Sequence, residues 1–357
     1  MRREKQRKGK QVVIFLIKSG IAAVLLYLLL RKTRYEDFVE NFRTISWGWL
    51  VLATSLHIVG YIVSAHRWRI LLLAQGLQPS LWKLIKSYVI STFFNYILPG
   101  TILGDIYRAY DTGVRDRKGA QAVSAVFIER VTGVAAMMFL AGVGILFLLM
   151  GPRQLAGSSF WVIPAAVGIC AAIFLVLLAI IFVLFHPRIV EIIASKLDRP
   201  APLFSKLRKI FLSLHSAITV YRSDLRPIYK NLFWALVLQL NVITHWFFIG
   251  MAMGLPLLNF FSYMVIVPAI TLVLMVPITP GGIGVREWTI WAFRSLLGFA
   301  GAAVSRATAA LMSWLLVATV VLYGIIGFLM FMYRLFLAKR AERQTLQASQ
   351  TADTAEP

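Results

Sequence analysis

The chain has 357 residues, of which 59% are hydrophobic, and its mean hydropathy is +0.76. An ordinary soluble domain is about 45–50% apolar, whereas here several apolar runs are long enough to cross a bilayer as helices. These features exclude a water-soluble globule and predict an all-α polytopic membrane protein. The formal charge is +22, from 37 Lys and Arg against 15 Asp and Glu. Because the basic residues lie mostly between the apolar runs, we interpret the excess as membrane topology and lipid contact, and we expect no nucleic-acid partner.

The first apolar run, residues 12–30, follows a basic segment at residues 1–11. Arg31 and Lys32 come directly after the run and no small-residue cleavage site is present, so a retained span is favoured over a signal peptide. The sequence predicts six full crossings, at 12–30, 47–65, 120–150, 160–185, 231–253 and 307–333.

The connections between these runs differ in charge. Segments 66–86, 108–118 and 186–230 are basic, while 151–159, 254–260 and 298–305 contain a single charge, Arg153. The positive-inside rule therefore predicts an inner-membrane protein with the basic loops and both termini in the cytoplasm.

Two segments are predicted to lie outside the spans. Within the basic loop 186–230, residues 203–221 place apolar side chains on one helical face and basic ones on the other. This pattern indicates a helix that either lies in the membrane interface or packs on the bundle as a lid. The tail 336–357, which follows a single membrane domain at 12–335, is predicted to be disordered because its last part is polar and lacks aromatic residues.

Two further apolar segments, 81–98 and 261–276, run into Pro- and Gly-containing breaks. The helix that follows the first break, at 101–110, is too short to cross, and the helix that follows the second break, at 285–297, returns toward the same uncharged, external face. We therefore predict two oppositely inserted re-entrant hairpins, whose irregular backbone faces the protein interior or water. Paired breaks of this kind predict an inverted repeat with a binding site at the midplane. The alternative is two unrelated loops at helix ends.

Ionisable side chains gather near the first break and on the third span. Placing a charged side chain within the membrane costs free energy, so each such residue is a candidate functional residue. The predicted substrate-binding residues of this region are Asn95, Pro99, Gly100, Gly104, Asp105, Arg108, Glu129 and Arg130. Together with the charges of the second break, their formal charges cancel, which makes a neutral buried network the structural alternative.

The second break predicts an anion-binding helix terminus. Its predicted substrate-binding residues are Thr279, Pro280, Gly281, Gly282, Gly284, Arg286 and Glu287. Thr279 is expected to cap the helix and Pro280 to be its first residue, with the glycine N–H groups open to an approaching anion. Arg286 then completes a seat for a phosphate or phosphodiester. The alternative is an ion pair of Arg286 with a carboxylate such as Glu287, Asp105 or Glu129.

Other features point away from catalysis. The single cysteine, Cys170, provides no disulfide, and the five histidines have no metal-ligand spacing. No nucleophile elbow or Walker loop is present, so we expect no metal, no cofactor and no enzymatic activity. Segment 66–69, His-Arg-Trp-Arg, is interpreted as an interfacial anchor at the end of the second span, with headgroup contact as the alternative.

Segments 95–108, 129–133 and 277–287 resemble the lysylphosphatidylglycerol-synthase transmembrane-region family, which shares the membrane half of the bacterial multiple peptide resistance factor. The resemblance covers about residues 12–333 and rests most on Pro-Gly-Gly-x-Gly-x-Arg-Glu at the second break. It implies a lipid-translocating bundle with two oppositely inserted re-entrant hairpins. The resistance factor also carries a soluble aminoacyltransferase domain, whereas this chain ends in a short polar tail, so lipid synthesis is not expected.

From these observations we expect a flippase or transporter that moves a phosphate-bearing lipid, a phospholipid or a polyprenyl phosphate, between leaflets. The alternative is a membrane enzyme or enzyme subunit in polyprenyl-phosphate glycolipid or aminoacyl-lipid metabolism. The expected partners are membrane lipids with an anionic headgroup or a lipid phosphate. A homo-oligomer stays open as an alternative.

Overall fold

The structure is a computed structural model of the chain. It describes residues 17, 19–31, 35–97, 103–113, 118–150, 168, 172, 175–176, 179, 182–183, 186–196, 202–255, 260–275, 278–297 and 305–353. These residues contain helices and no strand, which confirms the predicted all-α class. The basic segment 1–11 and most of the predicted span 160–185 lie outside the described residues.

Four helices are long and apolar enough to cross a membrane: α3 (Trp47–Ala74), α6 (Gly119–Met150), α10 (Arg226–Ala252) and α13 (Arg306–Asp353, apolar to Leu337). They correspond to four of the six predicted crossings. In each of these helices, at most half of the residues in the apolar stretch are buried inside the protein. The remaining apolar side chains are available to lipid. The protein is a multi-pass membrane protein. The first run is described as a shorter apolar helix, Ser19–Leu30.

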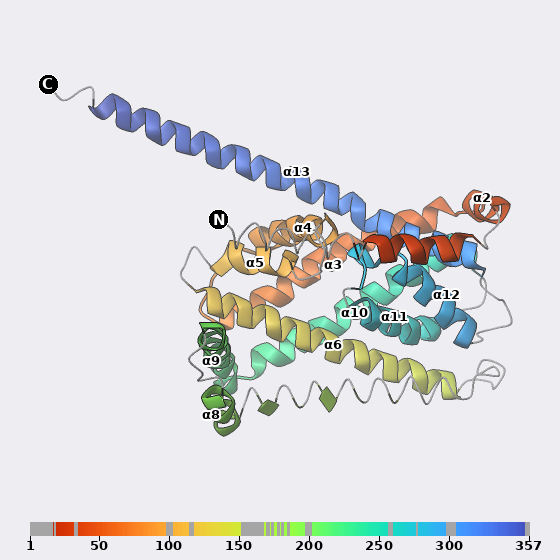
Figure 1. Ribbon diagram of the computed structural model, residues 1–357, viewed down its shortest axis with the longest axis horizontal. Coiled ribbons are helices and arrows are strands. Elements are labelled where there is room, and N and C mark those ends of the chain that lie inside the picture. The colour runs from red at the N-terminus through yellow and green to blue at the C-terminus, as the bar shows by residue number, and fades with distance from the viewer. Residues whose placement is uncertain are drawn as a thin grey trace.

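The long helices form one bundle, whose axis runs horizontally in Figure 1. α3 and α10 pack along each other in opposite directions. Ser46 N–H donates to the carbonyl of Ala252 at 2.7 Å, and at the other end of the pair Asn231 Nδ2 donates to the carbonyl of Arg67 at 2.9 Å. α3 and α10 correspond to the second and the fifth predicted crossings, and an even and an odd crossing run in opposite directions through the membrane.

Two predicted boundaries are wrong. α3 continues to Ala74, beyond the predicted end at residue 65, because residues 70–74 are apolar and favour helix. α13 continues to Asp353, so the tail predicted to be disordered from residue 336 is helical over most of its length. Ala, Gln, Glu, Lys and Arg dominate that stretch, and they favour helix even where no apolar face is buried.

Two pairs of shorter helices lie at opposite ends of the bundle (Figure 1). α4 (Leu81–Ile97) and α5 (Leu103–Gly113) form one pair and contact each other. α11 (Phe260–Met275) and α12 (Val285–Leu297) form the other pair, joined through the 3₁₀ helix η2 (Pro280–Gly282). We call them the α4–α5 hairpin and the α11–α12 hairpin. α4 contacts η2, so the α4–α5 hairpin meets the turn of the α11–α12 hairpin.

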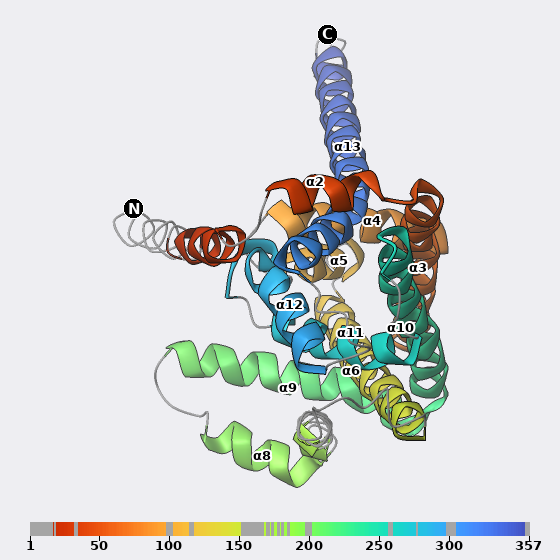
Figure 2. The same cartoon turned by 90° about the vertical axis from the view of Figure 1, so that its right-hand side faces the viewer.

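α8 (Pro187–Lys196) and α9 (Pro202–Ser223) lie across the α5 end of the bundle, seen end-on in Figure 1 and along their length in Figure 2. Near its C-terminal end α9 is docked: Ile218 and Tyr221 are fully buried, and the Tyr221 hydroxyl donates to the Leu71 carbonyl at 3.0 Å. This contact supports the lid alternative for that end of α9. Most side chains of the predicted apolar stripe lie outside the described residues.

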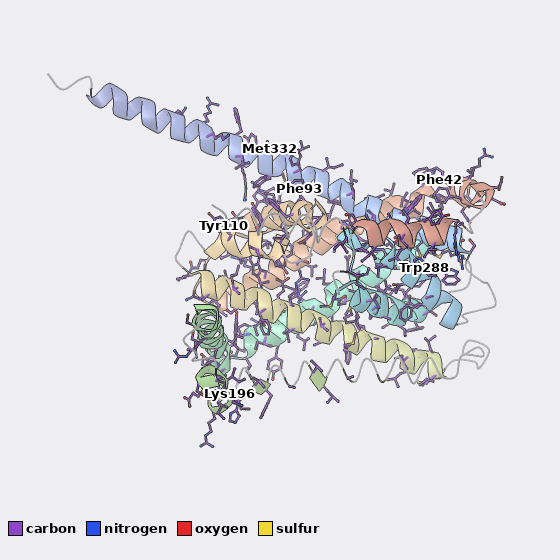
Figure 3. All side chains as sticks on the ribbon, in the orientation of Figure 1. Phe42, Phe93, Tyr110, Lys196, Trp288 and Met332 are labelled. Carbon is purple, nitrogen blue, oxygen red and sulfur yellow. The ribbon has the colours of Figure 1, made fainter. Side chains whose placement is uncertain are left out.

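Smaller helices and aromatic contacts complete the two ends. α2 (Tyr35–Arg43) lies at the end opposite to α8, and its Phe38 ring is 5.0 Å from the Trp314 ring of α13. In Figure 3, Phe93 lies where α4 meets α13, and Trp288 lies on α12 near the opposite end. One buried apolar cluster joins α6, α10, α11 and α13, and a second joins α3, α4, α6 and α9.

Candidate functional site

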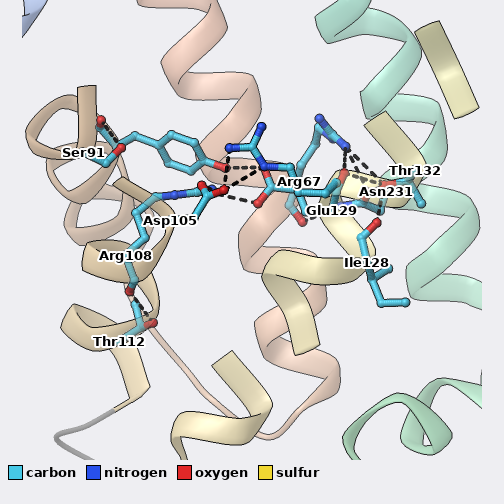
Figure 4. Close-up of polar contacts among 11 residues, drawn as sticks. Arg67, Ser91, Asp105, Arg108, Thr112, Ile128, Glu129, Thr132 and Asn231 are labelled. Atoms are coloured by element: carbon cyan, nitrogen blue, oxygen red, sulfur yellow. Dashed lines mark hydrogen bonds and ion pairs between the residues drawn. The ribbon is translucent and has the colours of Figure 1, made fainter. Parts of the chain in front are cut away.

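The first candidate site lies where α5 packs on α6 (Figure 4). Arg108 Nη2 is 2.5 Å from Asp105 Oδ1, and its Nη1 is 3.1 Å from Glu129 Oε2. Arg130 binds the other oxygen of Asp105, with Nη2 at 2.5 Å and Nε at 2.8 Å. The structure thus brings four predicted residues into one group with two positive and two negative charges, which we call the α5–α6 charge cluster.

Aromatic rings from α3 and α4 cover the Arg108 guanidinium. Its Cζ lies 4.0 Å from the ring centroid of Tyr88 and 4.9 Å from that of Trp68. The Tyr88 hydroxyl also donates to Glu129 Oε1. Arg108 is 3% exposed, so its ion pairs and cation–π contacts are shielded from water and strengthened. The sequence did not identify Tyr88, because nothing separates an aromatic residue at a site from one in an apolar core, and it placed Trp68 in the interfacial anchor at residues 66–69.

Arg67 is a further member of this region that the sequence analysis assigned to an interfacial anchor. α3 carries it into the bundle, where it is 2% exposed. Its Nη2 donates to neutral oxygens: the Glu129 carbonyl at 3.1 Å, Thr132 Oγ1 at 3.3 Å and Asn231 Oδ1 at 3.4 Å. The anchor interpretation is therefore wrong for Arg67. The apolar residues 70–74 were the signal that the span continues past it.

Asn95 and Gly104 shape the α4–α5 hairpin. Asn95 Oδ1 accepts the N–H of Gly104 at 2.9 Å. A Cβ at position 104 would lie 2.5 Å from Asn95 Oδ1 and 2.6 Å from the Ser91 carbonyl, so only glycine allows this approach of α5 to α4. The structure therefore gives both residues a role in the turn. Pro99 and Gly100, also predicted site residues, lie outside the described residues.

The second candidate site is the turn of the α11–α12 hairpin. Gly281, Gly282 and Gly284 have φ of 61°, 72° and 81°, a region that residues with a Cβ avoid. The left-handed glycines delay the helix start to Val285, so Pro280 belongs to η2 and is not the first residue of α12. Thr279 does not cap α12 either, because its hydroxyl donates to the Ile283 carbonyl at 2.8 Å. The predicted helix start was wrong in both respects.

Glu287 caps α12 instead. Its Oε2 accepts the Gly284 N–H at 2.7 Å, and its Oε1 accepts the Ser313 hydroxyl at 2.8 Å. A carboxylate three residues after the capping position is the arrangement of a capping box. Glu287 is 2% exposed. The N–H of Gly284, predicted to receive an outside anion, is therefore already bonded to a carboxylate of the chain.

Arg286 turns back over the break, where its Nη2 donates to the Gly281 carbonyl at 2.9 Å. No described carboxylate forms an ion pair with it, so the alternative of a pair with Glu287, Asp105 or Glu129 is wrong among the described residues. A Cβ at Gly281 would have no neighbour nearer than 4.0 Å. Arg286 therefore lies half-buried beside an open backbone position.

The charged residues form two groups, so the alternative of a single neutral buried network is wrong among the described residues. Asp105, Arg108, Glu129 and Arg130 belong to the α5–α6 charge cluster, while Arg286 and Glu287 lie at the α11–α12 turn. In the described part of the chain, no three His, Cys, Asp or Glu side chains gather as metal ligands.

Comparisons with known proteins agree with this architecture. The family model described as "Lysylphosphatidylglycerol synthase TM region" matches residues 15–310, which include both hairpins and the α5–α6 charge cluster. No curated protein matches the chain. The match covers most of the sequence, and the chain belongs to the lysylphosphatidylglycerol synthase transmembrane-region family.

Proposed function

We propose that this membrane protein moves a phosphate-bearing lipid between the two leaflets, with Arg286 binding the headgroup phosphate at the α11–α12 turn. One observation carries the proposal. Arg286 is half-buried at a helix break, and its guanidinium donates a hydrogen bond to a backbone carbonyl. No described carboxylate forms an ion pair with it. A guanidinium offers paired donors that match the oxygens of a phosphate.

The two hairpins support the proposal by their placement. They approach from opposite ends of the bundle and meet where α4 contacts η2. We propose that both are re-entrant, that the turn lies at membrane depth, and that both termini face the cytoplasm of the inner membrane. A binding group at the meeting point of two opposed hairpins is accessible to either leaflet through modest rearrangement of one hairpin against the other.

Transport of a fluorescent phospholipid by the purified protein in proteoliposomes tests this proposal. We expect Arg286→Ala to slow headgroup movement about tenfold or more, because a hydrogen bond to a charged group contributes about 1.5–3 kcal/mol. Arg286→Lys should retain part of the rate, since a point charge replaces a planar fork. Arg222→Ala, at an exposed position on α9, is the matched control.

The same experiment separates transport from catalysis. Lipids extracted from the proteoliposomes should have unchanged masses, because we propose movement without covalent chemistry. A new lipid species without headgroup movement would favour the alternative of a membrane enzyme or enzyme subunit. Normal transport by a folded Arg286→Ala protein would eliminate the proposed role of Arg286.

A further inference from the structure

The described carboxylates near the two candidate sites are all occupied by donors of the chain itself. Four acidic side chains lie on the hairpin helices and α6: Asp105, Asp111, Glu129 and Glu287. Both oxygens of each accept a hydrogen bond or ion pair, from Arg108 and Arg130, from Arg334, from Tyr88 and Arg108, and from Gly284 and Ser313, respectively. A cationic ligand would have to displace one of these donors to reach a carboxylate.

Three guanidinium groups in the same part of the molecule, by contrast, have no carboxylate partner among the described residues. Arg67 and Arg286 donate only to neutral oxygens among the described residues. Arg306, at the other end of the loop that follows α12, lies against two indole rings, with its Cζ 4.7 Å from the Trp291 centroid and 5.6 Å from that of Trp288. None of the three forms an ion pair with a described carboxylate.

Three segments outside the described residues adjoin α4, α11 and α12 in the sequence and contain no acidic residue. Residues 98–102, 276–277 and 298–304 contain no Asp or Glu in the sequence. The sequence between α12 and Arg306, and the residues that directly follow α4 and α11, therefore contain no Asp or Glu. Among the described residues, guanidinium groups without an ion pair thus lie near carboxylates whose oxygens are all bonded.

This imbalance selects among headgroups. A phosphate can bind Arg286 without breaking any bond other than the one to the Gly281 carbonyl. An ammonium group that leaves water needs a carboxylate or several oxygen acceptors, and leaving it unpaired costs far more than leaving it in solvent. The site thus favours a phosphate and penalises amino groups attached to the same headgroup.

We infer that the transported lipid has a net-anionic headgroup, such as a phosphodiester or phosphomonoester without amino groups, and that aminoacylated headgroups are disfavoured. This inference rests on the proposed function. Arg286 supplies the contact at the turn. Arg306, held by Trp288 and Trp291, supplies a second guanidinium for the same class of headgroup beside the first half of α12.

The test compares three labelled lipids in one set of proteoliposomes: phosphatidylglycerol, phosphatidylethanolamine and an aminoacylated phosphatidylglycerol. We expect phosphatidylglycerol to move about tenfold faster than the aminoacylated lipid, with the zwitterionic lipid between them. Arg286→Gln should bring this rate ratio toward one, a change that general destabilisation does not produce. Arg222→Gln, matched in chemistry and exposed on α9, should leave the ratio unchanged, and melting temperatures verify that each variant is folded.

The outcomes distinguish the two proposals. Movement of none of the three lipids by the wild-type protein contradicts the proposed function itself. Equal movement of all three, or faster movement of the aminoacylated lipid, overturns the anionic selectivity while transport stands. A folded Arg286→Gln protein with the wild-type rate ratio shows that Arg286 does not select the headgroup.

Discussion

Removal of Arg108 tests how the α4–α5 hairpin is fixed to the bundle. Its guanidinium is 3% exposed, lies 2.5 Å from Asp105 Oδ1 and 3.1 Å from Glu129 Oε2, and stacks on two aromatic rings. Arg108→Met leaves one oxygen of each carboxylate without a donor, although Asp105 keeps Arg130 and Glu129 keeps Tyr88. Breaking a buried pair in this way costs about 3–5 kcal/mol of unfolding free energy.

The double variant sharpens this prediction. Arg108→Met with Glu129→Met removes both charges of the pair and leaves Asp105 balanced by Arg130. Because replacing a buried ion pair by apolar side chains is often near neutral, the double variant should be more stable than Arg108→Met alone. Melting in detergent measures both, and Arg334→Met, whose pair with Asp111 is partly exposed, should cost only about 0–1 kcal/mol. Additive losses in the double variant, or equal losses in Arg108→Met and Arg334→Met, would refute the reasoning.

Three more predictions follow from particular contacts. Gly104→Ala forces a Cβ to 2.5 Å and 2.6 Å from two oxygens of α4, so the melting temperature should fall by an amount equivalent to about 1–3 kcal/mol; an unchanged value contradicts the turn geometry. Tyr221→Phe should cost about 1 kcal/mol. Since burial raises the pKa of Tyr221 to about 12, that difference should be constant below pH 10 and be lost as the pH rises through 12; a difference that changes between pH 6 and 9 argues against a buried phenol. With a cytoplasmic N-terminus and a first span at residues 12–30, the proposed topology puts residue 44 outside and residue 205, in the basic loop 186–230, in the cytoplasm. In a Cys170→Ala background, Thr44→Cys should therefore react with an impermeant thiol reagent outside intact cells, whereas Ser205→Cys should not; the opposite pattern overturns the proposed topology.

The long helices were predictable because length and apolar content alone define a span. α6 begins and ends within one residue of the range expected from the sequence. The boundaries failed where charge interrupted the apolar pattern, since Arg67 and Arg69 were taken as the end of a span that continues to Ala74. Hydropathy cannot show that a bundle contains an asparagine and a threonine able to bond a buried arginine. The apolar residues 70–74 indicated that the helix continues past Arg67, but its bonding partners depend on the packing of α3 against α6 and α10.

The α5–α6 charge cluster was partly predictable. Asp105 and Arg108 are three residues apart, so one helix brings them together. Their meeting with Glu129 and Arg130 depends on how α5 lies on α6, which no local pattern determines. The aromatic cover from Tyr88 and Trp68 depends in the same way on α3 and α4. Contacts between neighbours in sequence were thus predictable, whereas contacts with residues of other helices were not.

The α11–α12 turn shows why counting charges along a sequence misleads. Arg286 and Glu287 are adjacent and opposite in charge, yet successive residues point about 100° apart on a helix. The carboxylate turns inward, where the N–H of Gly284, at the capping position of α12, and the Ser313 hydroxyl need an acceptor. Those neutral donors and the helix dipole stabilise the charge of Glu287 without an arginine. Arg286 consequently has no carboxylate among the described residues to compensate it, and the need to cap a helix is what leaves a guanidinium available to a ligand.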